Sequence, residues 1–265
     1  MGKLILILFS LFFHFNLFSQ NNVTDHIYKK IDSVNLEFKL YKPDSFNPKK
    51  KYNTIILFHG GGFNSRYADQ FSRHSKYFNT RNFIAITPVY RIKSLHDTTP
   101  QESCDDAKDL IEYLYSNADK YNINKDRIFV GGGSAGGLLA LSTTFWKVKN
   151  HKIKGLILYN PIVDTGPNSA FSKRRSGNYS LDISPINNIN KKHPPSIIFH
   201  GSLDEMEPIN KIKKYKEISS KYGTRCDVII YSEQGHSFFN KQEFFIKTSE
   251  EVDKFLYSLG YIENR

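Results

Sequence analysis

The sequence predicts an α/β protein with one mostly parallel central sheet of about seven to eight strands and helices on both faces. Two features of the 265-residue chain lead to this prediction. From residue 34 onward, strand-like segments alternate with helix-like segments, which is the pattern of a parallel sheet covered on both sides. In addition, segments such as Thr54 to Phe58 are unbroken apolar runs, as expected of strands buried on both faces. No repeat or flexible linker divides the chain, so a single domain is predicted.

The strands follow from their apolar patterns. The first alternates apolar and polar residues from Val34 to Leu40 and stops before Pro43, which indicates a half-exposed strand. The later ones are more apolar, and they cover residues 54–58, 83–87, 128–131, 153–159, 196–200 and 227–231. Seven strands are therefore expected.

Four helices are predicted between and after these strands. Apolar residues recur with helical spacing in the segment 102–117, which indicates an amphipathic helix. A second, apolar helix begins just after Ser134, and a third spans roughly residues 209–221. The last covers residues 243–259 and ends at Gly260, since glycine commonly follows the end of a helix.

The N-terminus has the layout of a secretory signal peptide. Lys3 is followed by an almost unbroken apolar run from Leu4 to Phe18, which is shorter than the roughly 20 residues of a membrane span. We therefore expect residues 1–19 to be a signal peptide and residues 20–265 to form the mature domain, secreted or periplasmic. An uncleaved membrane anchor is the alternative, whereas the absence of a following cysteine argues against a lipoprotein.

Composition excludes several other classes of protein. The net charge is +11, but the basic residues are mostly lysines spread along the chain, with no helix-length basic stripe, so no nucleic-acid partner is expected. The two cysteines, Cys104 and Cys226, have no zinc-binding spacing. They are predicted on distant elements and therefore as free thiols. We expect neither a metal nor a cofactor.

The segment Gly132-Gly133-Ser134-Ala135-Gly136 fits the pattern G-x-S-x-G. It lies after a predicted strand and before a predicted helix, where a serine can be held on a sharp, strained turn that requires small neighbours. The amino-terminal end of the helix favours negative charge beside that serine. The context predicts that Ser134 is a nucleophile, and the alternative is a glycine-rich turn with an incidental serine.

The segment His59-Gly60-Gly61-Gly62 follows the predicted strand 54–58. Glycines at that place allow backbone N–H groups to approach a negatively charged oxygen, and the N–H of Ala135 would complete an oxyanion hole. A phosphate-binding loop is the competing interpretation, but the lysine and hydroxyl residue of that motif are missing.

A nucleophilic serine needs a base and an acid that orients the base. His236 is the predicted base, because it lies on a loop between the last strand and the last helix, whereas His200 ends a strand and is expected to serve structure. Asp204 follows the strand 196–200, which makes it the predicted acid. The order Ser134, Asp204, His236 is the one expected of an α/β-hydrolase.

Other carboxylates compete with Asp204 for this role. Asp164 follows the segment Tyr159-Asn160-Pro161 and is the main rival acid. Glu205 and Glu207 are the remaining candidates, since both lie on the same loop as Asp204.

Together, four motifs resemble those of the α/β-hydrolase superfamily, specifically its esterases with an HGGG oxyanion loop, the bacterial hormone-sensitive-lipase group. The resemblance covers about residues 34–259. It implies that backbone N–H groups of Gly61, Gly62 and Ala135 form the oxyanion hole. The matching motifs are His59-Gly60-Gly61-Gly62-Phe63, Gly132-Gly133-Ser134-Ala135-Gly136-Gly137, His200-Gly201-Ser202-Leu203-Asp204 and Gly235-His236.

The chain departs from many members of that group, because barely a dozen residues separate the predicted signal peptide from the first predicted strand. We therefore expect a more open site than under a long N-terminal cap, and in this respect the chain is similar to compact carbohydrate esterases of the acetylxylan and feruloyl types. The expected function is an exported serine carboxylesterase for short-acyl or carbohydrate-linked esters, with a small-molecule or polysaccharide partner. A prolyl-oligopeptidase-like peptidase and a non-catalytic binding protein are the alternatives.

One long insert lies between the strands that end near Tyr159 and begin at Ser196. It holds an aromatic and basic set of residues that would form a rim over the pocket, with an ordinary surface excursion as an equal alternative. These residues are Phe171, Arg174, Arg175 and Tyr179.

Overall fold

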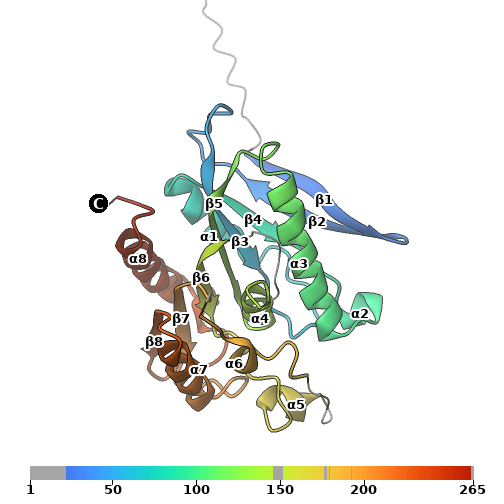
Figure 1. The fold of residues 1–265 in the computed structure, drawn as a ribbon, viewed down its shortest axis with the longest axis vertical. Helices are drawn as coiled ribbons and strands as arrows, with labels where there is room; N and C mark the ends of the chain where they lie inside the picture. The colour runs from blue at the N-terminus through green and yellow to red at the C-terminus, as the bar shows by residue number, and fades with distance from the viewer. Residues whose placement is uncertain (1–21, 146–151, 176–177, 179, 192, 264–265) are drawn as a thin grey trace, which may run out of the picture.

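The computed structural model describes residues 22–145, 152–175, 178, 180–191 and 193–263. The predicted signal peptide, residues 1–19, lies outside the described residues. The described strands form one eight-stranded sheet in the order β1-β2-β4-β3-β5-β6-β7-β8 (Figure 1). The pairs β1–β2 and β2–β4 are antiparallel, and the others are parallel. The predicted α/β class and mostly parallel sheet are confirmed.

The seven predicted strands are all present, and most extend slightly beyond the predicted limits. Beside them lies an unpredicted eighth strand, β1. The strands are β1 (Val23–Ile31), β2 (Val34–Tyr41), β3 (Tyr52–Phe58), β4 (Phe83–Pro88), β5 (Ile123–Gly133), β6 (Ile153–Tyr159), β7 (Ser196–Gly201) and β8 (Cys226–Tyr231).

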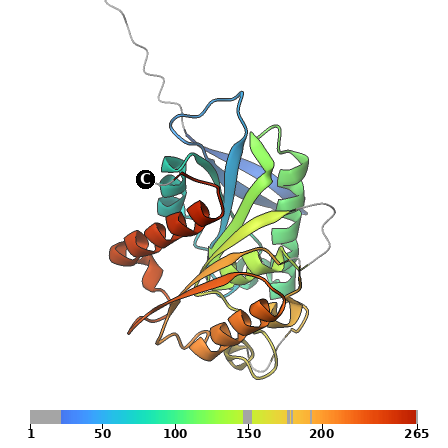
Figure 2. The ribbon, with the colours of Figure 1, turned by 60° about the vertical axis from the view of Figure 1, so that its left-hand side comes forward.

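Helices cover both faces of the sheet, as Figure 2 shows. The apolar cores contain side chains of α1 and α8 on one face and of α3, α4 and α7 on the other. The described helices are α1 (Ser72–Thr80), α2 (Lys93–His96), α3 (Pro100–Ser116), α4 (Ala135–Ser142), α5 (Ala170–Arg174), α6 (Pro185–Asn188), α7 (Ile209–Lys221), the 3₁₀ turn η1 (Phe238–Asn240) and α8 (Gln242–Ser258).

The strand register places the described ends of the chain at one end of the sheet. Val23 pairs with Tyr41, which in turn pairs with Ala85 in the first half of β4. Near the other terminus, the Tyr261 carbonyl accepts a hydrogen bond from the Asn53 side chain at the start of β3. Both ends of the described chain therefore lie at the amino-terminal end of the parallel strands.

Strand β1 lies between the predicted signal peptide and the first predicted strand. Its apolar signal is weak because most of its side chains are partly exposed. The register shifts between Ile27 and Lys29, a β-bulge that disrupts the regular alternation. Tyr28 anchors the strand, since its ring is buried and its hydroxyl donates to the Val89 carbonyl at 2.8 Å.

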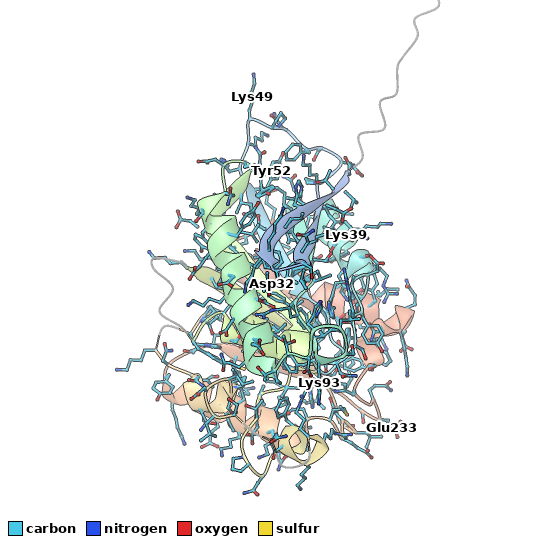
Figure 3. All side chains as sticks on the ribbon, turned by 90° about the vertical axis from the view of Figure 1, so that its right-hand side faces the viewer. Asp32, Lys39, Lys49, Tyr52, Lys93 and Glu233 are labelled. Atoms are coloured by element: carbon cyan, nitrogen blue, oxygen red, sulfur yellow. The ribbon has the colours of Figure 1, made fainter. Side chains whose placement is uncertain are left out.

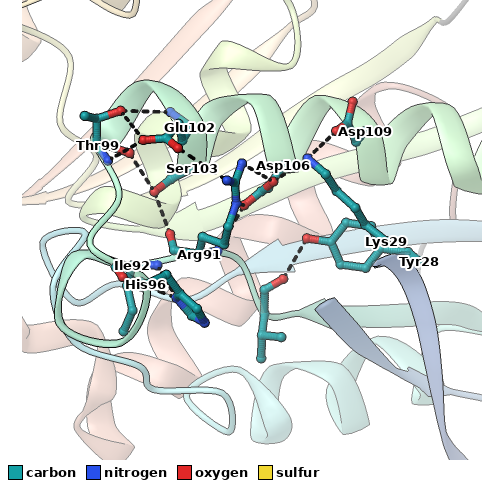
Figure 4. A network of polar contacts seen from close by, with 11 residues as sticks. Tyr28, Lys29, Arg91, Ile92, His96, Thr99, Glu102, Ser103, Asp106 and Asp109 are labelled. Atoms are coloured by element: carbon teal, nitrogen blue, oxygen red, sulfur yellow. Dashed lines mark hydrogen bonds and ion pairs between the residues drawn. The ribbon is translucent and has the colours of Figure 1, made fainter. Parts of the chain in front are cut away.

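A buried carboxylate joins β1 to α3 (Figure 4). Asp106 is fully buried, and it binds Lys29 Nζ at 2.6 Å and Arg91 Nε at 2.9 Å. The same helix begins with a capping box in which Thr99 and Glu102 satisfy each other's backbone N–H groups. Lys29 thus ties the edge strand β1 to α3, and Arg91 ties the segment after β4 to the same carboxylate.

The cysteines and the surface lysines lie where the composition suggested. Both cysteines are free and buried, Cys104 in α3 and Cys226 at the start of β8, as predicted. Lys39, Lys49 and Lys93 lie far apart over the surface in Figure 3, in keeping with dispersed basic residues. Within the described residues, no helix is long and apolar enough to span a membrane.

A buried histidine, His74, lies between α1 and the sheet. His74 is 2% exposed, and its ring packs against Phe71, Tyr159 and Phe245. Neither ring nitrogen forms a hydrogen bond with the described part of the chain. Burial lowers the pKa of His74 to about 3, so the folded protein keeps this ring neutral where the unfolded chain would protonate it.

Replacing His74 with Phe is expected to reduce the acid sensitivity of folding. Because the folded-state pKa lies below the unfolded value of about 6.5, the wild type loses stability as the pH falls, and His74 contributes about 2 kcal/mol of the loss between pH 7 and 5. Phenylalanine does not titrate. Urea unfolding at pH 7 and at pH 5 gives the free energy of unfolding of each protein. Its decrease between the two pH values should be about 2 kcal/mol smaller in the variant than in the wild type. Equal decreases would contradict the prediction.

Candidate active site

The segment around Ser134 forms a sharp turn between β5 and α4. Ser134 has φ 54° and ψ −119°, a conformation that is costly for a residue with a side chain. Backbone hydrogen bonds hold it there, since its N–H donates to the Tyr159 carbonyl at 2.9 Å and its carbonyl accepts from Leu138 at 3.2 Å. The turn exposes the serine side chain at the carboxyl end of the sheet.

Two glycines beside Ser134 are required by close backbone approach. A Cβ atom on Gly136 would lie 2.1 Å from the Phe58 carbonyl oxygen. A Cβ atom on Gly132 would lie 2.5 Å from the same oxygen. The turn is therefore packed directly against the end of β3, in agreement with the predicted need for small residues on both sides of the serine.

Ser134, His236 and Asp204 form a continuous hydrogen-bonded chain. His236 Nε2 lies 2.7 Å from Ser134 Oγ, and His236 Nδ1 lies 2.8 Å from Asp204 Oδ2. Because a carboxylate only accepts, Nδ1 carries the proton, and Nε2 is left free to accept the serine proton. The three side chains come from the loops that follow β5, β7 and β8.

The surroundings of Asp204 keep its carboxyl ionised. Burial favours the protonated form, but the hydrogen bond and charge of His236 and the Asn160 side chain outweigh burial and hold the pKa of Asp204 below its usual value. Asp204 Oδ1 also accepts from the backbone N–H groups of Met206 at 2.8 Å and Glu207 at 3.1 Å. The carboxylate is thus fixed on both oxygens.

The glycine loop after β3 lies beside Ser134. A Cβ atom on Gly60 would be 3.4 Å from the Ser134 Cβ. Gly61 and Gly62 both have positive φ, at 117° and 61°, and the Gly61 carbonyl accepts from two N–H groups at 2.9 and 3.0 Å. That carbonyl belongs to the same peptide unit as the Gly62 N–H, so its hydrogen bonds fix the direction of this donor.

His59, the first residue of the glycine loop, is buried against Tyr90. Its ring stacks on Tyr90 at 4.4 Å, and the Tyr90 hydroxyl donates to the His59 carbonyl at 2.9 Å. Burial lowers the pKa of His59 to about 4, so the ring stays neutral near pH 7. This histidine is therefore a packing residue of the loop.

Comparisons with known proteins agree with this arrangement. A family model described as BD-FAE matches residues 38–165. The apo form of esterase 2 from Thermogutta terrifontis matches with a TM-score of 0.84 at 30% identity, covering 92% of this chain and 97% of the other. The propionate-bound form of the same esterase matches with a TM-score of 0.83 at the same identity and coverage. The chain belongs to the α/β-hydrolase superfamily.

The predicted resemblance of this α/β-hydrolase to esterases is confirmed by these structural matches. An AB hydrolase superfamily protein of Schizosaccharomyces pombe is also 30% identical to it over 119 residues. That alignment covers 43% of this chain and 32% of the relative, so the chain spans about a third of the length of this curated relative.

None of the rival acids of the α/β-hydrolase forms a hydrogen bond or ion pair with the His236 ring within the described residues. Asp164 binds Lys211 Nζ at 2.6 Å and accepts from the Gly166 N–H at 2.8 Å. Glu205 is exposed, and Glu207 reaches Asp204 through its backbone N–H. Asp204 is the carboxylate that the structure brings to His236.

His200 is fully buried and bonds to the chain itself. Its Nε2 donates to the Glu207 carbonyl at 2.9 Å, and this places the ring behind Asp204. This contact fixes the loop that contains Asp204 and Glu207. His236 is the histidine that reaches Ser134.

Sequence reasoning missed two supporting residues of the site. Asn160 Nδ2 donates to Asp204 Oδ2 at 2.5 Å, and Gln70 Oε1 accepts from the Gly60 N–H at 2.6 Å. Asn160 has φ 44°, and an asparagine between the end of a strand and a proline is a recognisable turn signal. Gln70 had no such signal, because its partner is defined by the folded loop.

The insert between β6 and β7 forms one wall of a cavity of about 810 Å³ next to the glycine loop. Phe171, Arg174 and Arg175 line this cavity together with Gly62. Of the predicted rim residues, these three are therefore part of a pocket wall, and Tyr179 lies outside the described residues. The rim interpretation agrees with this geometry better than a surface excursion does.

Proposed function

We propose that this α/β-hydrolase is a serine carboxylesterase in which Ser134 is the nucleophile, His236 the base and Asp204 the orienting acid. The observation that carries the proposal is the unbroken chain from Ser134 Oγ through His236 to Asp204, with contacts of 2.7 and 2.8 Å. Nucleophilic catalysis by serine needs this arrangement, because the hydroxyl is weak until a fixed base takes its proton.

The reaction would proceed in two steps. Ser134 Oγ attacks the ester carbonyl carbon while His236 Nε2 takes the hydroxyl proton, and backbone N–H groups of Gly61, Gly62 and Ala135 stabilise the oxyanion. The C–O bond to the alcohol then breaks, and His236 returns the proton to the departing alkoxide. Water then attacks the acyl carbon while His236 Nε2 takes one of its protons. The bond between that carbon and Ser134 Oγ breaks, and His236 returns the proton to Oγ, which releases the acid and restores Ser134.

The proposed substrates are esters with short acyl groups, or carbohydrate-linked esters of the acetyl or feruloyl type. Structures of the Thermogutta esterase have propionate or butyrate bound, and this chain covers 97% of that protein. These short acids support a short acyl group in the substrate. The cavity beside Gly62 provides room for one substituent of the ester.

We also propose that the enzyme is exported, secreted or periplasmic, on the strength of the positively charged start and apolar run in residues 1–19. Expression of the full chain in a Gram-negative host should yield active protein in the periplasm or medium. N-terminal sequencing of this protein should begin near residue 20. Active protein that keeps its first residues and stays in the cytoplasm would contradict export.

A substrate panel tests the activity itself. Short 4-nitrophenyl esters, acetylated xylan and feruloylated arabinoxylan separate the ester classes, and a dipeptide anilide tests the peptidase alternative. We expect hydrolysis of the esters and not of the anilide. Cleavage of the anilide alone would favour the peptidase, and complete inactivity with no labelling by paraoxon would favour the binding protein.

A further inference from the structure

Arg175 combines partial burial with direct contact to the glycine loop. Its guanidinium lies 4.8 Å from the ring centre of Phe171 and 5.6 Å from that of Phe63. One N–H donates to the Gly62 carbonyl. The group is therefore held in a defined place, between two aromatic rings and beside the predicted oxyanion donors.

No carboxylate neutralises this guanidinium. Every Asp and Glu side chain of the sequence lies within the described residues, and none of them forms an ion pair with Arg175 there. Arg81 and Arg91, by contrast, bind Asp253 and Asp106. Burial lowers the pKa of Arg175, because a charged group without a counterion is less stable when it is partly removed from water.

Most of the hydrogen-bonding capacity of Arg175 is also unused. A guanidinium has five N–H donors in a planar fork that matches a carboxylate. Within the described residues, a single one of these donors is engaged, by the Gly62 carbonyl. The remaining donors are available to a ligand in the cavity that Arg175 lines.

The cavity itself carries a positive charge. Three cationic side chains line it, from Lys93, Arg174 and Arg175, against one carboxylate, Asp97. Its walls mix these charges with the apolar side chains of Phe171 and other residues. Such a lining favours an organic anion over a purely apolar group.

The same cavity adjoins the loops that carry the proposed reacting residues, although Ser134, Asp204 and His236 do not line it themselves. Gly62 lines it directly. Ile162, another lining residue, donates its N–H to the Ser134 carbonyl at 3.3 Å, and Met206 donates its N–H to Asp204. The cavity is therefore next to the proposed site of reaction, where one part of an ester substrate can occupy it.

We propose that the cavity binds a carboxylate carried by the ester substrate, with Arg175 as the anchoring residue. This inference rests on the proposed esterase function and specifies its substrate class. The carboxylate would belong either to the acyl part, as in a half-ester of a dicarboxylic acid, or to the alcohol part, as in an acetylated hydroxy acid or sugar acid. Both share the recognised chemistry, one carboxylate against a guanidinium fork.

Two matched substrate pairs distinguish these sources. 4-Nitrophenyl hemisuccinate is compared with the neutral 4-nitrophenyl pentanoate, which places the charge on the acyl side. 4-Acetoxybenzoate is compared with 4-acetoxybenzamide, which places it on the alcohol side. For one of the pairs, we expect the wild-type kcat/KM to favour the charged ester roughly 10- to 100-fold, the range of a hydrogen-bonded charge contact.

Arg175→Gln is the decisive variant, and the ratio of kcat/KM for the charged and neutral esters is the readout. The ratio should fall by the same 10- to 100-fold, and Arg175→Lys should give an intermediate ratio because it keeps the charge but loses the fork. Any general damage through Gly62 affects both esters and cancels in the ratio. Lys173→Gln should leave the ratio unchanged, because Lys173 is an exposed residue of α5, two positions before Arg175, and does not line the cavity.

Two outcomes would overturn the proposal, and they differ. Hydrolysis of the neutral esters with no preference for either charged ester, or with a ratio unchanged in Arg175→Gln, would overturn the carboxylate site and leave the esterase function standing. A wild type that hydrolyses none of the four esters and is not labelled by paraoxon would overturn both.

Discussion

Replacing Ser134 with Ala is expected to lower kcat for a short 4-nitrophenyl ester by about 10⁶-fold, the size of effect seen when a serine hydrolase loses its nucleophile. The cause is the loss of Oγ, the proposed nucleophilic atom, which lies 2.7 Å from His236 Nε2. Without Oγ no acyl-enzyme can form, and the remaining backbone donors can act only on direct attack by water.

Paraoxon gives a second readout for the same variant. The related Thermogutta esterase is phosphorylated by paraoxon, and intact-mass analysis of this hydrolase should reveal one diethylphosphoryl adduct that disappears in Ser134→Ala. Ser237→Ala is the matched control, because Ser237 is exposed and adjacent to His236 in sequence. Near-wild-type hydrolysis or labelling by Ser134→Ala would exclude Ser134 as the nucleophile.

Replacing Asp204 with Asn is expected to lower kcat by about 10⁴-fold. The amide can donate to His236 Nδ1 and so favour the tautomer that carries its proton on Nε2, where the ring can no longer accept from Ser134. It also removes the charge that stabilises the protonated imidazole. Since Asn has nearly the same shape, the backbone contacts to Oδ1 are disturbed little.

Asp164→Asn is the control for this prediction, because Asp164 was the main rival acid and is paired with Lys211 instead of His236. Its kcat should stay within about tenfold of the wild type, since the lost ion pair lies outside the hydrogen-bonded chain. Steady-state kinetics on one ester compares both variants. A larger loss in Asp164→Asn than in Asp204→Asn would reverse the assignment of the acid.

The parts of the fold that the sequence predicted are those with a regular apolar pattern. The helix predicted at residues 209–221 is α7 (Ile209–Lys221), and the buried strands lie where unbroken apolar runs stand. Helix α1 was missed because its buried face is made of His74, Ser75 and Phe78, of which only Phe78 is a usual core residue. Its burial depends on aromatic residues that are distant in sequence, Tyr159 of β6 and Phe245 of α8.

The site was predictable where chemistry restricts the choice of residue. A strained serine between glycines, and a histidine and an aspartate after late strands, can be located by position, and the structure brings the three within hydrogen-bond distance. Asn160 and Gln70 could not be located this way. Their amides serve Asp204 and Gly60 across 44 and 10 residues, and many side chains could supply one hydrogen bond.

The strand register has a consequence for attachment. Val23 and Tyr261 lie at the amino-terminal end of the parallel strands, whereas Ser134, Asp204 and His236 follow the carboxyl ends of theirs. A surface joined to either end of the described chain, whether a membrane reached through an uncleaved leader or a resin reached through a tag, would leave the catalytic edge facing solution. Polymers too large to enter a pocket could then reach Ser134 without passing the support.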